Sequence, residues 1–198
     1  MSDTGRTAAA EKTGVGSHFI ANYPPFSLWT HEAVETDAKP ALAHRPADVP
    51  LGLYLHIPFC RKRCHFCYYR VYTDRNASEV AEYLDLLGRE WELYATQPAV
   101  AGRPLRFVYF GGGTPSFLSV RQLQGLIDRL SCVTPWTDAD EITFECEPGT
   151  LTEPKLAAIR EMGITRLSLG LEHFDDQVLE FNGRAHRSAE IFRAYTFA

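Results

Sequence analysis

Short apolar runs alternate with longer amphipathic stretches along most of the chain. Four runs have the length and composition of buried strands: 53–57, 105–110, 141–146 and 165–169. Three stretches open on a capping residue and repeat apolar positions every three or four residues: about 76–96, 119–130 and 152–162. A further helical stretch opens at Asp175 or Asp176. Strand and helix thus alternate four times, which predicts an α/β fold with a parallel sheet, either coiled toward a barrel or doubly wound.

The first 50 residues lack this periodicity. Residues 1–16 are small and polar, which predicts disorder. Residues 17–50 combine five prolines with aromatic residues, which predicts an irregular arm that packs through its rings. We therefore expect two parts, 1–50 and a barrel-like part over 51–198.

Composition narrows the function classes. The 198 residues are 45% hydrophobic and 23% charged, with a formal net charge of −5, which argues against a nucleic-acid or membrane-surface partner. No apolar run reaches the roughly 18 residues of a membrane span, and the N-terminus lacks the apolar region of a secretory signal, so we expect a cytoplasmic protein. Of the five cysteines, Cys132 and Cys146 have no partner in the pattern and are expected to be buried apolar residues.

The other three cysteines, Cys60, Cys64 and Cys67, directly follow the first predicted strand. A C-x3-C-x2-C loop is too cramped for a good disulfide, and in a reducing compartment such a group more often binds metal. Three thiolates on a cubane iron–sulfur cluster would leave one iron open to chelate a substrate. The alternative is a zinc site completed by His65 or His56.

Three further motifs also follow predicted strands. A glycine loop, residues 111–115, could let a ligand approach the backbone, although such loops are more often simple turns. Glu145 and Glu172 close the third and fourth strands, where they are either ligand contacts or solvated carboxylates. Arg184 could pair with a carboxylate or be a helix-surface charge. Since the carboxyl ends of parallel strands share one rim, we expect a pocket for a zwitterionic ligand chelated to an open iron.

Four segments carry a resemblance to a known family: YLHIPFC with its cysteine motif, GGGTPS, EITFECEPGT and RLSLGLEHFDDQVLEFNGRAHR. Together they resemble the oxygen-independent coproporphyrinogen III oxidase family of the radical S-adenosylmethionine superfamily. The resemblance covers about residues 51–190 in unbroken motif order. The segment NYPPF at 22–26 is similar to the arm of the oxidase branch, whereas the haem-chaperone branch generally starts close to the first strand.

The resemblance implies that Cys60, Cys64 and Cys67 ligate a [4Fe–4S] cluster. It implies S-adenosylmethionine contacts from eight residues: Tyr54, Phe66, Gly112, Gly113, Thr114, Glu145, Glu172 and Arg184. Phe66 would contact the adenine, Glu145 would hold the amino group, and Arg184 would pair with a carboxylate. It further implies reductive cleavage to a 5′-deoxyadenosyl radical, hydrogen abstraction from a small-molecule substrate such as a porphyrinogen, and an electron donor such as flavodoxin or ferredoxin.

Two positions depart from the family pattern. Tyr69 stands where the oxidases commonly have a further cysteine, and Glu172 stands where the family often has glutamine. Related branches with the same core include methyltransferases, cyclopropane-forming enzymes, haem-utilisation enzymes and haem chaperones. Barrels of the superfamily have about six strand–helix units and four are visible here, so we expect a partial TIM-like (β/α) barrel that is truncated at its C-terminus.

Overall fold

The computed structural model describes residues 29–198. The predictions for residues 1–28, including the oxidase-like segment at 22–26, lie outside this range. The chain divides into two units, with the boundary between Ala41 and Leu42. No helix among the described residues is long and apolar enough to cross a membrane.

The expectation of an irregular arm is wrong for residues 31–43. Helix α1 (His31–Ala33), the π-helical η3 (Val34–Ala38) and α2 (Lys39–Ala43) form one helical run. Thr30 caps the run by accepting a hydrogen bond from the backbone N–H of Ala33. Pro40 lies after the π-helical turn, whose wider hydrogen-bond spacing accommodates a residue that lacks an N–H.

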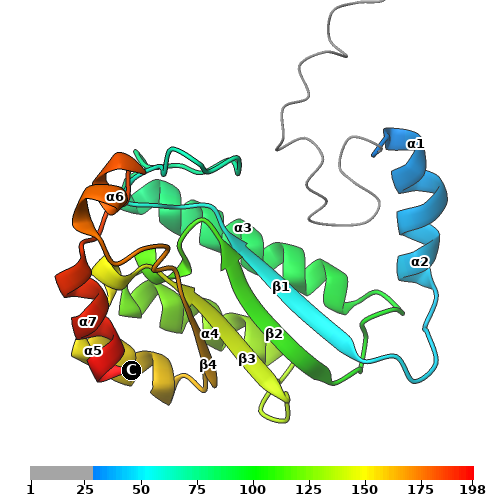
Figure 1. Cartoon of the computed structure of the whole chain (residues 1–198). Helices are drawn as coiled ribbons and strands as arrows, with labels where there is room; N and C mark the ends of the chain where they lie inside the picture. The colour runs from blue at the N-terminus through cyan, green and yellow to red at the C-terminus, as the bar shows by residue number, and fades with distance from the viewer. Residues whose placement is uncertain (1–28) are drawn as a thin grey trace, which may run out of the picture. The chain divides into compact units, whose positions relative to one another are not determined.

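A four-stranded parallel sheet forms the centre of the second unit. Its strands are β1 (Leu51–Ile57), β2 (Leu105–Gly112), β3 (Glu141–Cys146) and β4 (Arg166–Leu169), in the spatial order β1-β2-β3-β4. The connecting helices are α3 (Ala77–Ala95), α4 (Val120–Val133) and α5 (Glu153–Glu161). Because each right-handed crossover moves to the next strand in the same direction, these helices cover one face of the sheet (Figure 1). This order favours the barrel-like arrangement over the doubly wound one, in which the strand order reverses.

The helices begin where the sequence predicts. Asn76 accepts hydrogen bonds from two backbone N–H groups of α3 and completes a capping box with Glu79. Ser119 accepts from the backbone N–H of Gln122 and completes a capping box with that residue at the start of α4. Gly163 follows α5 with φ of 88°, the left-handed conformation usual at a helix end. The last predicted helical stretch is two helices, α6 (Asp176–Phe181) and α7 (Ser188–Phe197).

Alternate strand residues point to opposite faces of the sheet. The helix-facing set is fully buried and forms the core with the helices, among them Leu55, Ile57, Val108, Phe110, Ile142 and Phe144. Cys146 belongs to this core, as expected. Cys132 is exposed, which makes that prediction wrong: it lies outside the stripe of α4 formed by Leu123, Ile127 and Leu130.

Strand β4 has no second neighbour in the described sheet. An apolar groove of about 830 Å³ runs along this edge between α5, β4 and the end of α7. Four strand–helix units with an open edge are what the sequence predicts for a partial barrel.

We expect Asn76→Ala to destabilise the second unit, because it removes the side chain that satisfies two N–H groups at the start of α3. The free energy of unfolding should fall by about 1 kcal/mol. Urea denaturation followed by far-UV circular dichroism measures it. Ser78→Ala, inside the same first turn but without the capping role, is the control, and an equal effect from both variants would contradict the assignment.

Candidate functional site

The loop after β1 carries the three clustered cysteines. Its course is fixed by backbone hydrogen bonds from Tyr72 N to Pro58 O (2.8 Å) and from Cys60 N to Tyr72 O (3.0 Å). The loop therefore leaves the strand and returns to it within fifteen residues. All five cysteines of the chain are free thiols; Cys60 is buried, while Cys64 and Cys67 are half-buried.

Two adjacent cavities open beside this loop, at the carboxyl ends of the strands. The first, of about 220 Å³, is lined on one side by the cysteine loop and on the other by residues from later loops: Cys60, Cys64, Phe66, Cys67, Tyr69, Gly112, Gly113, Thr114, Glu147, Glu172 and Arg184 among them. The second, of about 280 Å³, is lined by Gly113, Thr114, Glu145, Cys146, Glu147, Ser168, Gly170, Glu172 and Arg184. The two share several residues, so the predicted motifs do meet at one rim.

Polar side chains contact two of the thiols directly. Thr114 Oγ1 donates to Cys60 Sγ at 3.3 Å, and Arg184 Nη1 donates to Cys64 Sγ at 3.1 Å. Burial raises the pKa of the Cys60 thiol, and the hydrogen bond from Thr114 and the charge of Arg184 only partly oppose this effect. At Cys60, both the hydrogen bond from Thr114 and the charge of Arg184 favour the thiolate form that a metal centre requires.

The glycine loop lies against the cysteine loop. Gly113 N donates to Ile57 O at 2.8 Å, and a Cβ at this position would lie 3.0 Å from Cys60 Sγ and from two backbone carbonyl oxygens. Gly112 adopts φ of 112°, and its N–H points to Glu145 Oε2 at 3.2 Å. The glycines are needed here because the two loops touch through their backbones.

Glu145 is positioned at the end of β3 by Tyr109, whose hydroxyl donates to Oε1 at 2.6 Å. Burial and the neighbouring carboxylate raise the pKa of Tyr109 to about 12, so the phenol stays a donor. Tyr54 stacks on Tyr109 with ring centroids 5.8 Å apart, and its hydroxyl lies 3.2 Å from His56 Nδ1. Tyr54 is 57% exposed and lines neither cavity, and it contacts the site through Tyr109, which holds Glu145.

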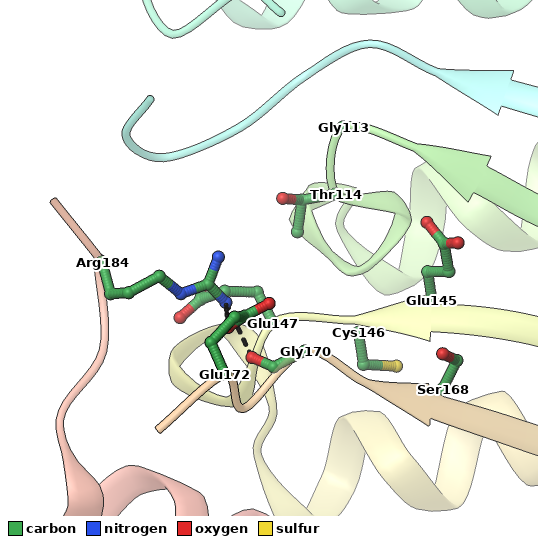
Figure 2. Close-up of a pocket in the computed structure, with 9 residues that line it drawn as sticks. All are labelled: Gly113, Thr114, Glu145, Cys146, Glu147, Ser168, Gly170, Glu172 and Arg184. Carbon is green, nitrogen blue, oxygen red and sulfur yellow. Dashed lines mark hydrogen bonds and ion pairs between the residues drawn. The ribbon is translucent and has the colours of Figure 1, made fainter. Parts of the chain in front are cut away.

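Arg184 is not a helix-surface charge, because its side chain is only 10% exposed. Figure 2 shows it reaching toward Glu172 and Gly170 from the segment after α6. Nη2 lies 2.6 Å from Glu172 Oε2 and donates to Gly170 O at 2.7 Å. Nε is buried and has no hydrogen-bond partner among the described residues. A buried guanidinium donor without a partner fits an oxyanion ligand, such as the carboxylate of an amino acid.

The zinc alternative fits less well. His65 Nδ1 lies 2.7 Å from Phe181 O, and His56 Nδ1 lies 3.2 Å from the hydroxyl of Tyr54, so in each candidate histidine Nε2 is the nitrogen left to bind a metal. Over residues 29–198, no three His, Cys, Asp or Glu side chains converge on a single-ion position. The thiolates of a cubane bind separate irons and need no such convergence, so the three cysteines suit a cluster.

Sequence reasoning missed the partners of Glu147. Its buried carboxylate contacts Arg61 in the cysteine loop and His186 after α6. These residues are 86 and 39 positions away from it, and no local pattern links them. Their positions in the sequence could have indicated them, because each lies close to a predicted site residue. Arg61 directly follows Cys60, and His186 lies two residues after Arg184.

Comparisons with known proteins agree with this geometry. A family model described as the radical SAM superfamily matches residues 54–198. The heme chaperone HemW of Bacillus subtilis is 37% identical over 143 residues, which is 72% of this chain and 37% of the relative. The oxygen-independent coproporphyrinogen III oxidase of Escherichia coli K12 is 32% identical over 185 residues, which is 93% of this chain and 40% of the relative.

A solved structure gives the same match in three dimensions. The coproporphyrinogen III oxidase HemN from Escherichia coli, described as a radical SAM enzyme, aligns with a TM-score of 0.78 at 31% identity. The alignment covers 91% of this chain and 41% of that one. The chain therefore spans about two-fifths of the length of these relatives.

We expect Gly113→Ala to disrupt the rim, because neither of the two carbonyls near its Cβ can move without shifting the cysteine loop. Iron and sulfide uptake during anaerobic reconstitution should fall well below that of the unchanged protein, as overpacking of about 1–3 kcal/mol displaces Cys60. Gly125→Ala is the matched control, since a Cβ there meets nothing within 4 Å. Equal iron contents in both variants would show that the close approach at Gly113 is dispensable.

Proposed function

Because the chain belongs to the radical SAM superfamily, whose cofactors are a [4Fe–4S] cluster and S-adenosylmethionine, we propose that Cys60, Cys64 and Cys67 ligate the cluster here. The observation that carries this proposal is the position of the three thiols. They lie on the loop after β1, beside a cavity whose far wall bears Gly113 and Arg184. At Gly113 a ligand can come close to the backbone, and Arg184 supplies a buried positive charge next to the proposed metal ligands.

When bound, the two cofactors together supply a 5′-deoxyadenosyl radical, which takes a hydrogen atom from the substrate. The chain's own residues bind and orient the cofactor. The free Nε of Arg184 suits the methionine carboxylate, and Glu145 and Glu172 are acceptors for its ammonium group or for ribose hydroxyls. Phe66, 53% exposed on the cysteine loop, offers a ring face for the adenine.

For the reaction, we propose a coproporphyrinogen oxidase-like oxidative decarboxylation in porphyrin biosynthesis, in the cytoplasm, with flavodoxin or ferredoxin as electron donor. Two matches support the oxidase branch. The oxidases of Synechocystis and Escherichia coli align with 87% and 93% of this chain, whereas the HemW relatives align with 72–77%. The oxidases of Cereibacter sphaeroides align with 69%, so the longer match is a feature of part of the oxidase branch. The longer matches include part of the segment before β1. The chain spans only about two-fifths of the length of these relatives. The reaction of the whole protein is therefore a proposal.

A second candidate is a haem chaperone that keeps the cluster without oxidase activity. The 37% identity to HemW from Bacillus subtilis exceeds the 32% to the Escherichia coli oxidase. Tyr69, which lines the cavity where the oxidases commonly have a cysteine, also favours this candidate.

Anaerobic reconstitution with iron and sulfide tests the cofactor. We expect about four irons per chain and the broad absorbance of an iron–sulfur cluster near 400 nm, both lost in the triple variant Cys60→Ala, Cys64→Ala, Cys67→Ala. Cys132→Ala, at the exposed cysteine of α4, is the control and should bind as much iron as the unchanged chain. A triple variant that retains the absorbance would refute the assignment of these ligands.

Product analysis separates the two candidates. For an oxidase, reduced and reconstituted protein forms 5′-deoxyadenosine from S-adenosylmethionine faster when coproporphyrinogen III is present. For a chaperone, coproporphyrinogen III has no effect on this rate, and haem binds to the protein instead. Chromatographic assay of 5′-deoxyadenosine and haem titration give the two readouts.

A further inference from the structure

Glu147, directly after β3, is a buried anion with an unusually full set of contacts. It is 8% exposed, and its carboxylate accepts from Arg61 Nε (2.9 Å), Arg61 Nη2 (3.0 Å), and Gly149 N (3.1 Å). His186 Nδ1 lies 2.9 Å from the same carboxylate. Burial raises the pKa of the Glu147 carboxyl, but the hydrogen bonds from His186 and Arg61 outweigh this effect and hold the pKa below its usual value. Although Glu147 forms part of the cavity wall, its oxygens are engaged by protein groups.

The partners of Glu147 belong to separate segments of the rim. Arg61 directly follows Cys60 and also donates to Ala185 O at 3.2 Å. His186, fully buried, has its Nε2 3.3 Å from Leu171 O, in the loop after β4. The Glu147 carboxylate therefore links the cysteine loop to the segment between α6 and α7, which has no regular structure of its own.

We propose that Glu147 is a positioning residue for the iron–sulfur cluster. Through Arg61 it holds the cysteine loop, and through His186 it holds the segment that presents Arg184. One carboxylate thus joins the two, in addition to the direct contacts of Arg61 with Ala185 O and of His65 with Phe181 O. This inference rests on the proposed cluster at Cys60, Cys64 and Cys67.

The contact between Arg184 and Cys64 makes the proposal measurable. The guanidinium donates to the Cys64 sulfur at 3.1 Å, and a cation at this distance favours the reduced, more negative state of a cluster. When the charge of Glu147 is removed by substitution with glutamine, one carboxylate oxygen is replaced by an NH2 donor. The side chain then keeps a single, uncharged acceptor for Arg61 and His186, which contact both oxygens in the unchanged chain. The cysteine loop then opens more easily, and Arg184 is no longer fixed beside the thiolate.

The experiment compares the reconstituted 198-residue chain with the variants E147Q and R61K. E147Q keeps the shape of the side chain and removes its charge, while R61K keeps the charge at a half-exposed site and removes the two-pronged hydrogen bond. E92Q is the matched control, because Glu92 accepts from Arg129 Nε at 2.7 Å between α3 and α4, away from the rim. Iron release to a chelator and the midpoint potential from an EPR-monitored redox titration are measured at equal initial cluster content.

We expect E147Q and R61K to lose iron about tenfold faster than the unchanged chain, the size of effect usual for groups that orient metal ligands. We also expect R61K, which keeps both charges of the pair, to have a more negative midpoint potential, and E92Q to match the unchanged chain in both readouts. In E147Q the loss of a nearby negative charge shifts the potential in the positive direction, so iron release is the readout for that variant. If E147Q does not fold, R61K alone decides. Rates and potentials equal to those of E92Q would overturn the inference, even if the melting temperature falls. If the unchanged chain takes up no cluster, the proposed function itself fails.

Discussion

Parallel pairing of β1 with β2, and of β2 with β3, brings the ends of strands that are far apart in sequence to one edge of the sheet. His56 lies beside Gly111, and Ile57 lies beside Gly112, so the cysteine loop and the glycine loop start at neighbouring points. Glu145 pairs in the same way with Ser168 on β4. Since each loop leaves its strand at this shared edge, a small change of register would separate the thiols from the rest of the site.

Two of the three carboxylates at the rim are paired with basic side chains. Glu172 lies against Arg184, and Glu147 lies between Arg61 and His186, whereas Glu145 accepts from the neutral donors of Tyr109 and Gly112. A buried carboxylate without such partners would be strongly destabilising, because its desolvation would not be compensated. The rim therefore combines a rigid ionic framework with one buried donor, the Nε of Arg184, that has no partner among the described residues.

Local sequence patterns predicted most of the fold. Helix starts at Asn76 and Ser119 were predictable because a cap acts over three residues, and the strands because their apolar runs are short and continuous. The position of each motif after a strand also predicted that the motifs would meet at one rim, and ten of the eleven proposed site residues line the two cavities there. The contacts of Glu147 were not predictable, because they join segments whose proximity depends on the complete fold. The helical run at 31–43 was not predictable from its prolines, which favour irregular structure. Pro40 nevertheless lies within the run, directly after the π-helical turn.

The separation between the core and the loops at the strand ends has an evolutionary consequence. The residues that stabilise the fold pack between the strands and the helices, whereas the cysteines and glycines of the proposed site lie on loops at the strand ends. Loops of this kind can change without disturbing the core. Oxidases and heme chaperones are both found among the relatives, at 30–37% identity to this chain. When different residues carry the packing and the chemistry, the fold can be conserved between relatives while their functions diverge.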